Sequence, residues 1–285
     1  MSMKIGFIGL GVMGRPMVGH LIAAGHEVFL YRVKDVSQHL VEAGKALDNP
    51  KAVAEAADVI ILMLPDTPDV EAVLFGDDGV AQGLAMGKLV IDMSSISPFA
   101  TKAFAARIAE IGAGYVDAPV SGGEVGAKNA ALTIMVGASE GDFERALPLL
   151  KLMGKNITRI GGVGDGQTAK VVNQIIVGLT IEAVAEGLTL AKASGADPAK
   201  VREALMGGFA SSRILEVHGE RMINETFDPG FRIRLHRKDI GLALESAKAL
   251  DLYLPHAANL QQLMNKAIAD GLGDKDHSAL IKALS

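Results

Sequence analysis

The chain has 285 residues, of which 49% are hydrophobic, and its 28 basic and 33 acidic residues leave a net charge of -5 at pH 7. This length suggests one or two domains, since a domain usually holds about 100 to 200 residues. The negative balance provides no global positive field, so we expect neither nucleic acid nor a membrane surface as a partner. The chain has no cysteine, which excludes disulfides and thiolate zinc sites.

Two stretches bear on where the protein works. The first residues, MSMKIGFIGLG, lack the charged region and the uninterrupted apolar core of a secretion signal, so we expect a cytoplasmic enzyme. Residues 164–191 are apolar enough to raise the question of a membrane span. Asn173, Gln174, Glu182 and Glu186 interrupt this stretch at the depth where polar groups are costly in a bilayer. We therefore expect it to be buried in protein.

The beginning of the chain predicts a dinucleotide-binding turn. The apolar run 4–8, KIGFI, is followed by a G-x-G-x-x-G pattern and by a helical pattern that stops at Gly25. Between a strand and a helix, such glycines permit a tight turn and a close approach to a pyrophosphate, which the helix N-terminus also attracts. An ordinary glycine-rich turn is the alternative. The residues assigned to the cofactor are Gly9, Leu10, Gly11, Val12, Met13 and Gly14.

The end of the second predicted strand, 27–32, indicates which cofactor binds. An Asp or Glu normally lies here and binds the ribose of NAD. This chain has Tyr31 and Arg32 instead, followed by Val33 and Lys34. A guanidinium can bind a 2'-phosphate bidentately, so the pattern favours NADP(H) modestly over NAD(H). Asp35 follows closely, and Arg32 could equally stack on the adenine or point into water.

Two further strands end in candidate cofactor residues. The apolar run 58–64 is typical of a parallel strand that is buried on both faces. It ends at Leu64 and Pro65, which would lie at the carboxyl edge of the sheet, where ligands bind in doubly wound folds. The strand predicted at 88–92 leads to Ser95. That serine is either a helix cap or a contact of the nicotinamide.

A candidate anion-binding loop follows the next short strand. After Pro119 the chain continues with Ser121, Gly122 and Gly123, whose N–H groups can point together at an anion. A flexible turn is the alternative, because Ser-Gly-Gly is common in such turns.

The remaining pattern defines the domains. Strands and helices alternate up to residue 160, and only helices are expected afterwards, at 167–194, 198–206, 211–225, 237–250 and 255–270. We therefore predict an α/β Rossmann domain, with a doubly wound and mostly parallel sheet, followed by an all-α domain that a long interdomain helix joins to it. The expected ranges are 1–163 for the NAD(P)-binding domain, 164–193 for the helix and 194–285 for the helical domain.

Three polar residues lie at the start of the long helix. Lys170, Asn173 and Gln174 are three and four residues apart, which places them on one helical face, where they could converge on a small molecule. The alternative is an exposed polar end with the lysine stem lying over apolar surface. The seven histidines show no metal-binding spacing, so no metal site is expected. Among them only His236 has a place near the expected site.

Four motifs in chain order carry a resemblance. They are GFIGLGVMGRPM at the N-terminus, DAPVSGG at 117–123, GQTAKVVNQ at 166–174 and HRKDIGLAL at 236–244. Through them the sequence resembles the β-hydroxyacid dehydrogenase family along essentially its full length. The resemblance implies that Lys170 is the catalytic acid/base. It also implies the remaining roles: substrate binding by Ser121, Gly122, Gly123, Asn173 or Gln174, Phe231 and Asp239, and cofactor binding by Ser95 and Lys238.

The resemblance also implies a reaction. Within the family, IDMSSISP, DAPVSGGE, KVVNQIIV, PGFRIRLHRKD and GLGDKDHSAL are most similar to members that reduce tartronate semialdehyde. Other members act on 3-hydroxyisobutyrate, glyoxylate or succinic semialdehyde. One departure is that Gln174 stands where several relatives have Asn, which leaves open whether Asn173 or Gln174 contacts substrate. We expect a small carboxylated aldehyde or hydroxyacid as substrate and a homodimer or homotetramer; a cofactor-binding sensor or scaffold is the non-enzyme alternative.

Overall fold

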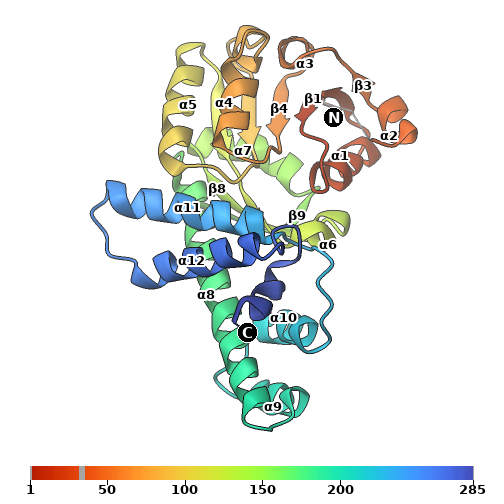
Figure 1. The fold of residues 1–285 in the computed structure, drawn as a ribbon. Helices are drawn as coiled ribbons and strands as arrows, with labels where there is room; N and C mark the ends of the chain where they lie inside the picture. Colours follow the sequence, from red (N-terminus) through yellow and green to blue (C-terminus); the bar gives the residue numbers. More distant parts are fainter. Residues whose placement is uncertain (1, 32–35, 285) are drawn as a thin grey trace. The chain divides into compact units, whose positions relative to one another are not determined.

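The computed structural model describes residues 2–31 and 36–284 (Figure 1). The chain divides into two compact units, residues 1–170 and residues 171–285, which we call unit 1 and unit 2. The three ranges expected from the sequence place their divisions elsewhere and stay a prediction.

Unit 1 contains a mostly parallel sheet. Its first strands are β1 (Lys4–Ile8), β2 (Glu27–Tyr31), β3 (Lys45–Ala46), β4 (Val59–Leu62), β5 (Leu89–Asp92) and β6 (Gly114–Asp117). They pair in parallel in the order β3-β2-β1-β4-β5-β6. The order reverses beside β1, and in folds of this kind the carboxyl ends of the strands at such a point bind ligands. The predicted Rossmann sheet is confirmed.

Three more strands extend the sheet beyond β6. They are β7 (Val120–Ser121), β8 (Leu132–Gly137) and β9 (Gly154–Gly161). β8 runs antiparallel to β6 and β7 and parallel to β9. The pairing of Ser121 with Thr133 fixes where the predicted anion-binding loop leaves the sheet.

Helices cover both faces of this sheet. They are α1 (Gly14–Ala23), α2 (Gln38–Ala43), α3 (Pro50–Ala56), α4 (Thr67–Phe75), α5 (Pro98–Glu110), α6 (Gly123–Lys128) and α7 (Glu140–Leu150), with a short 3-10 helix at Val80–Gln82. Successive residues of a strand point to opposite faces. In β4, Ile61 accordingly packs in the core under α1, whereas Ile60 and Leu62 pack in the core under α3 and α4. Burial on both faces is the reason that the strand sequences are almost continuously apolar.

Several short elements, and α5, were not expected from the sequence. α5 follows the strand β5 and begins at Pro98, a residue suited to the first turn of a helix. Ser97 caps it by accepting the N–H of Ala100 at 3.4 Å. The helix cap after β5 is therefore Ser97, and the interpretation of Ser95 as a cap is wrong.

Unit 2 is built around a long helix. α8 (Asp165–Ala193) starts in unit 1 and continues into unit 2, where α9 (Pro198–Leu205), α10 (Arg213–Ile223), α11 (Ile233–Ala249), α12 (Pro255–Ala269) and the 3-10 helix η2 (His277–Leu284) follow. α11 and α12 lie side by side (Figure 1). By length and composition alone α8 could cross a membrane. Ile181, Ala185 and Leu188 of this helix instead lie in the apolar core of unit 2, as expected for a core helix.

Candidate functional site

The glycine-rich loop follows β1 directly and leads into α1. A Cβ at Gly9 would overlap the carbonyl oxygen of Met63, and one at Gly14 would overlap the carbonyl oxygen of Gly9. A Cβ at Gly11 would have 4 Å of clearance from every described residue other than its two chain neighbours. The outer glycines are thus required by close packing, whereas the middle one leaves open space beside the start of α1. That space and those N–H groups suit a pyrophosphate.

The loops after β4 and β5 are tied together at the same edge of the sheet. The N–H of Leu64 donates to Ser94 Oγ at 2.9 Å, and the N–H of Ser94 donates to Asp92 Oδ1 at 2.9 Å. The hydroxyl of Tyr115 donates to the other oxygen of Asp92 at 3.0 Å. Burial, together with Asp92, raises the pKa of Tyr115 well above its usual range, so the phenol remains a donor.

Of the predicted cofactor residues in these loops, Leu64 therefore has its backbone N–H held by Ser94. Leu64 is buried, Pro65 is exposed and Ser95 is half-buried. They follow β4 and β5, and β4 pairs with β1, which precedes the glycine-rich loop. The structure thus brings this part of the predicted cofactor set to neighbouring strand ends. Tyr31, at the end of β2, packs against the core under α3 and α4, while Arg32 and Lys34, on which the NADP(H) preference depends, lie outside the described residues.

The segment from Ser121 to Gly123 combines a strand end with a helix start. Ser121 is the last residue of β7, Gly122 precedes α6, and Gly123 is the first residue of that helix. The φ angles of Gly122 and Gly123 are +127° and +60°, which side-chain-bearing residues rarely adopt. The segment that the sequence predicts as a loop is a sharp turn from β7 into the short helix α6, and its anion-binding role stays a prediction.

Two residues that the sequence analysis did not assign hold the start of α8. Asp117 Oδ1 accepts the N–H of Gly164 at 2.7 Å, and Asp117 Oδ2 accepts the N–H of Gln167 at 2.8 Å. The Gln167 side chain donates to the carbonyl of Ser94 at 2.8 Å and accepts the N–H of Ile96 at 3.1 Å. The backbone on each side of Ser95 is thus fixed to the first turn of α8.

Asp117 holds the start of α8 at an electrostatic cost, because its carboxylate is buried. Its side chain is fully buried, and burial raises its pKa to about 6, with Asp92 adding to the rise. The two backbone N–H bonds oppose that rise without cancelling it. DAPVSGG therefore contains a structural aspartate, which could have been suspected because a buried strand rarely ends in an unpaired acid.

Lys170 lies on α8, about one helical turn after Gln167. Only 8% of its surface is exposed, which makes the interpretation as a surface lysine wrong. A buried lysine needs a polar or charged environment and is a candidate for a functional role.

The polar residues assigned to unit 2 form a chain of contacts. Asn173 Nδ2 donates to Gln174 Oε1 at 2.7 Å, and Gln174 Nε2 donates to Asp239 Oδ2 at 2.5 Å. Lys238 Nζ lies 2.9 Å from Asp239 Oδ1. Gln174 and Asp239 are buried, whereas Asn173 is half-buried. The structure thus brings together four of the five residues that were assigned to the site in this unit.

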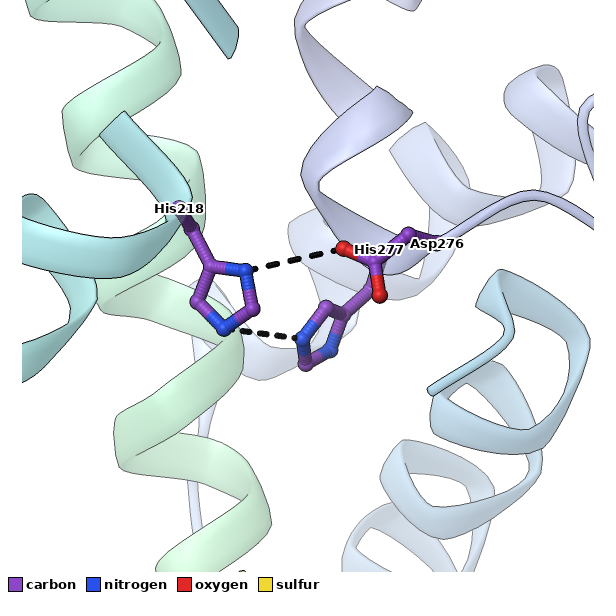
Figure 2. A group of neighbouring side chains, drawn as sticks. All are labelled: His218, Asp276 and His277. Carbon is purple, nitrogen blue, oxygen red and sulfur yellow. Dashed lines mark hydrogen bonds and ion pairs between the residues drawn. The ribbon is translucent and has the colours of Figure 1, made fainter. Parts of the chain in front are cut away.

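The fifth, Phe231, lies in a different cluster. Its ring packs edge-on against His236 and His277, with centroid distances of 5.7 Å and 5.6 Å. His277 in turn lies beside His218 and Asp276, which Figure 2 shows as one group. Spacing in the sequence could not reveal this cluster, because His218 and His277 are 59 residues apart.

Comparison with known proteins places the whole chain. Residues 4–162 match the model of the NAD binding domain of 6-phosphogluconate dehydrogenase, and residues 164–284 match that described as NAD-binding of NADP-dependent 3-hydroxyisobutyrate dehydrogenase. The chain is 57% identical over 283 residues to 2-hydroxy-3-oxopropionate reductase of Escherichia coli (strain K12), with 99% of this chain and 97% of that one covered.

Two further proteins resemble the chain over nearly its whole length. The sequence is 40% identical to 2-(hydroxymethyl)glutarate dehydrogenase of Eubacterium barkeri, over 99% of this chain and 94% of that one. The fold is similar to that of Mycobacterium tuberculosis 3-hydroxyisobutyrate dehydrogenase with L-serine, with a TM-score of 0.91 and 32% identity over 100% of this chain and 99% of that one.

Proposed function

Because the chain belongs to the β-hydroxyacid dehydrogenase family, we propose that it reduces tartronate semialdehyde, which is 2-hydroxy-3-oxopropanoate, to D-glycerate. It is an NAD(P)-dependent enzyme of the 3-hydroxyacid dehydrogenase type. The 57% identity to the Escherichia coli reductase favours this substrate over 3-hydroxyisobutyrate, for which the similar solved structure is 32% identical. Glyoxylate and succinic semialdehyde are less favoured candidate substrates.

The residues of unit 1 suit a nicotinamide dinucleotide. The open space at Gly11 lies at the start of α1, where N–H groups and the helix dipole attract phosphate. Residues 9–14 would hold the pyrophosphate. The nicotinamide half would contact Leu64, Pro65 and Ser95. Lys238, in the motif HRKDIGLAL, would also contact the cofactor. When bound, the cofactor supplies the hydride that reduces the aldehyde carbon. A preference for NADP(H) is part of the proposal and rests on Arg32 and Lys34 in the sequence.

Lys170 acts as the acid in the reduction. Its ammonium stabilises the negative charge that develops on the aldehyde oxygen, and its proton passes to that oxygen to give the alcohol. In the reverse direction the neutral amine accepts the same proton. The observation that carries this assignment is the burial of Lys170 one turn after a helix start that Asp117 and Gln167 hold in place. A fixed helix start gives the lysine a defined position, which general acid catalysis requires.

The substrate carboxylate is assigned to the turn from Ser121 to Gly123. The serine hydroxyl and successive backbone N–H groups can donate to its two oxygens. Of the two neighbouring amides, we assign the direct substrate contact to Asn173. Gln174 accepts a hydrogen bond from Asn173 and donates one to Asp239, so we assign it the role of orienting these two side chains. Phe231 and Asp239 complete the substrate-binding set.

We also propose that the protein works in the cytoplasm as a homodimer or homotetramer. Large apolar side chains that are exposed in unit 2 would be covered by association: Leu190, Leu205, Phe209 and Tyr253.

Substitution of Lys170 tests the proposed chemistry. Lys170→Ala is expected to lower kcat by about 10²-fold or more, the usual contribution of an acid/base, while cofactor affinity remains within about twofold. Lys192→Ala removes an exposed lysine from the same helix and is the matched control, which should keep normal kcat. Near-normal kcat in Lys170→Ala would refute the assignment. If the unsubstituted protein binds cofactor and reduces no aldehyde, the sensor or scaffold hypothesis is favoured.

A further inference from the structure

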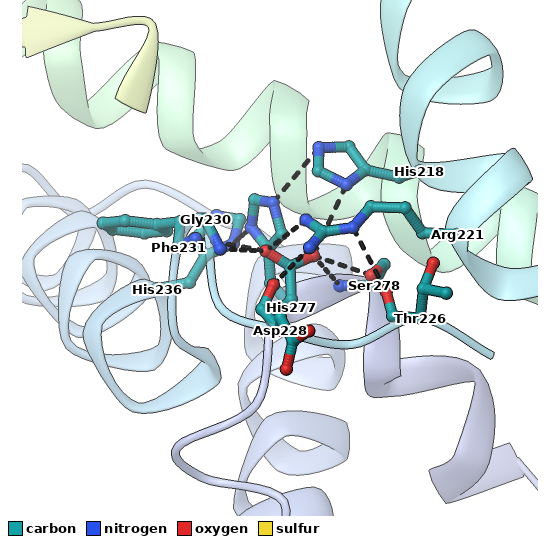
Figure 3. Close-up of polar contacts among 10 residues, drawn as sticks. His218, Arg221, Thr226, Asp228, Gly230, Phe231, His236, His277 and Ser278 are labelled. Atoms are coloured by element: carbon teal, nitrogen blue, oxygen red, sulfur yellow. Dashed lines mark hydrogen bonds and ion pairs between the residues drawn. The ribbon is translucent and has the colours of Figure 1, made fainter. Parts of the chain in front are cut away.

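Unit 2 contains a row of three buried or half-buried histidines, His218, His277 and His236 (Figure 3). His236 Nδ1 lies 3.0 Å from His277 Nδ1, and His277 Nε2 lies 3.2 Å from His218 Nε2. The row has an oxygen at each end. His236 Nε2 lies 3.0 Å from the backbone carbonyl oxygen of Gln174, and His218 Nδ1 lies 3.5 Å from Asp276 Oδ1.

The two end groups determine how many protons the row needs. Three of the four contacts have hydrogen-bond geometry, whereas His218 Nδ1 is buried, has no hydrogen-bond partner among the described residues and faces Asp276 Oδ1 at the longer distance of an ion pair. That ion pair forms only if the nitrogen has a proton, so the three hydrogen bonds and the ion pair together require four N–H protons. Three neutral imidazoles provide only three. Without a fourth proton, one contact would place a nitrogen lone pair against another acceptor, and that contact would be repulsive. Every contact of the row therefore has one proton only when one of the three rings is an imidazolium.

The surroundings decide which ring carries the extra proton. His277 is almost fully buried, and burial lowers its pKa well below the usual range, with His236, His218 and Arg221 lowering it further and Asp276 opposing them. His236 is fully buried and faces a neutral carbonyl. His218 faces the Asp276 carboxylate, with which a cation forms an ion pair. The geometry therefore places the fourth proton on His218 Nδ1, the ring nitrogen of the row that faces a carboxylate.

The same side chains include the residue types of a metal site, but the contacts of Asp276 argue against one. His218, Asp276 and His277 offer ligand atoms within 4.8 Å of one another. Asp276 Oδ1 already accepts the N–H and the hydroxyl of Ser278, at 3.1 Å and 2.6 Å. Asp276 Oδ2 accepts the N–H groups of Gly230 and Phe231 and lies 2.8 Å from Arg221 Nη1. A metal cation would have to be bound beside that guanidinium, which would repel it.

At its other end the row contacts α8 beside Gly178, whose lack of a side chain leaves room for the His236 ring. A Cβ at Gly178 would lie 3.2 Å from two ring atoms of His236 and 2.6 Å from a methyl of Leu260. Gly178 is one helical turn from Gln174, so its missing side chain lets the imidazole approach the Gln174 carbonyl. Gln174 in turn donates to Asp239, whose other oxygen pairs with Lys238. The histidine row thus ends on the backbone of the residue that orients the proposed substrate contacts.

We propose that His236, His277 and His218 share one extra proton in a relay from the Gln174 carbonyl to Asp276, and that this relay positions Gln174 and Asp239 for substrate binding. The three histidines are positioning residues and take no part in proton transfer to the substrate. The consequence for substrate binding rests on the function proposed above, whereas the proton count does not. Loss of the extra proton at high pH, or gain of a second at low pH, breaks one contact and loosens the relay.

Neutron diffraction from crystals of the perdeuterated full-length protein at pH 7 tests the proton count directly. We expect four deuterons on the three rings: two on His218, one on His277 Nδ1 and one on His236 Nε2. A total of three, or of more than four, would overturn the proposal, and so would a metal ion bound to His218 and His277. This result does not depend on whether the protein reduces an aldehyde.

Kinetics of His277 variants test the positioning role. His277→Phe keeps a ring and removes both contacts, so KM for the aldehyde should rise about tenfold, as for the loss of one charge-assisted hydrogen bond, with kcat changed less than about twofold. His277→Asn keeps a donor in the place of Nδ1 and should recover most of the lost affinity. The exposed His39 in α2 provides the control His39→Gln. Equal KM values in His277→Phe and in the unsubstituted protein would overturn the positioning role, even if Lys170→Ala proved inactive.

The pH profile separates positioning from simple loss of stability. In the unsubstituted protein KM should pass through a minimum with pH, because the relay is complete with one extra proton only. His218→Gln cannot carry that proton, so its KM should be raised and should depend less on pH. The same minimum in His218→Gln as in the unsubstituted protein would contradict the relay.

Discussion

Unit 1 and unit 2 each contain a fully buried aspartate that holds the chain together, and the two carboxylates have opposite electrostatic surroundings. Asp117 accepts backbone N–H groups, and the charged neighbour that affects it is the negative Asp92. Asp276 also accepts backbone N–H groups, but it lies beside the Arg221 guanidinium and His218. Burial raises the pKa of Asp117 to about 6. Burial alone would raise the pKa of Asp276 too, but His218, His277 and Ser278 hold it well below its usual range.

Backbone donors position a buried carboxylate but do not replace its lost hydration. Two N–H groups are sufficient to orient a buried carboxylate and to hold a helix start in place. They do not offset the loss of hydration, whereas neighbouring cations do. The first aspartate therefore holds α8 at a cost in charge burial, and the second is part of a charged network that is strongly coupled to its partners.

Removing the charged partner should have the largest effect on stability. Asp276→Ala leaves Arg221 and the histidine row without their carboxylate, so we expect it to destabilise unit 2 by about 3 to 5 kcal/mol. Hydrogen exchange of peptides from residues 171–285 would measure this loss. Asp274→Ala is the control, because Asp274 is exposed and its pairs with Arg232 and Arg234 lie at the surface, worth about 1 kcal/mol or less. Equal losses in the two variants would contradict the distinction.

Asp117→Asn should have a smaller effect. The amide can accept one backbone N–H and must turn its own donor toward the other, so the cost is expected to be about 1 to 3 kcal/mol. The backbone amide hydrogens of Gly164 and Gln167 should exchange faster with solvent. The value of kcat should fall because the start of α8, which positions Lys170, is held less rigidly. Asp77→Asn, at an exposed position in unit 1, is the control. Unchanged protection of both amides would show that Asp117 does not hold the helix start.

The two networks should also differ in the sign of their pH dependence, the smallest effect of the three. The folded-state pKa of Asp117 rises from 3.8 to about 6, so the folded state binds the extra proton and this stabilisation is lost as pH rises through that range. The folded-state pKa of His277 lies below 6.5, so the unfolded state binds the extra proton and stabilisation is lost as pH falls below 6.5.

Differences between the parent protein and each variant isolate these two contributions. The stability difference from Asp117→Asn should shrink as pH rises from about 4 to about 6, and that from His277→Asn should shrink as pH falls below about 6.5. Denaturant unfolding at several pH values, followed in each unit by hydrogen exchange, measures both. If the stability differences caused by Asp117→Asn and by His277→Asn shrank in the same direction of pH change, the two units would not differ in the sign of their pH dependence.

The fold could be predicted largely from the sequence because its signals are local. The run KIGFI, the glycines after it and the all-apolar stretch 58–64 each report a strand or a turn without knowledge of distant residues. α5 shows the limit: its start depends on Ser97 and Pro98, which were included in a motif and not considered as helix signals. The division into units at residue 170 depends on packing, and no local pattern marks it.

The candidate site could be predicted where motifs are contiguous. Lys170, Gln174 and Asp239 were named from short motifs, and the structure adds that Gln174 and Asp239 are hydrogen-bonded to each other. Asp117 and Gln167 were missed because their partners are backbone groups about 50 residues away or more. The histidine row was missed for the same reason: its members come from three helices, and periodicity within one helix cannot report their distances.

The most direct test of the proposed function is the steady-state rate of NADPH and NADH oxidation by the purified full-length protein with four aldehydes. These are tartronate semialdehyde, glyoxylate, succinic semialdehyde and methylmalonate semialdehyde, the oxidised partner of 3-hydroxyisobutyrate. We expect the highest kcat/KM with tartronate semialdehyde and NADPH, at least about tenfold above the other aldehydes, since one methylene or hydroxyl in a pocket changes selectivity by about that factor. Preference for another of the four would reassign the substrate, and no oxidation with any of them would contradict the proposed function.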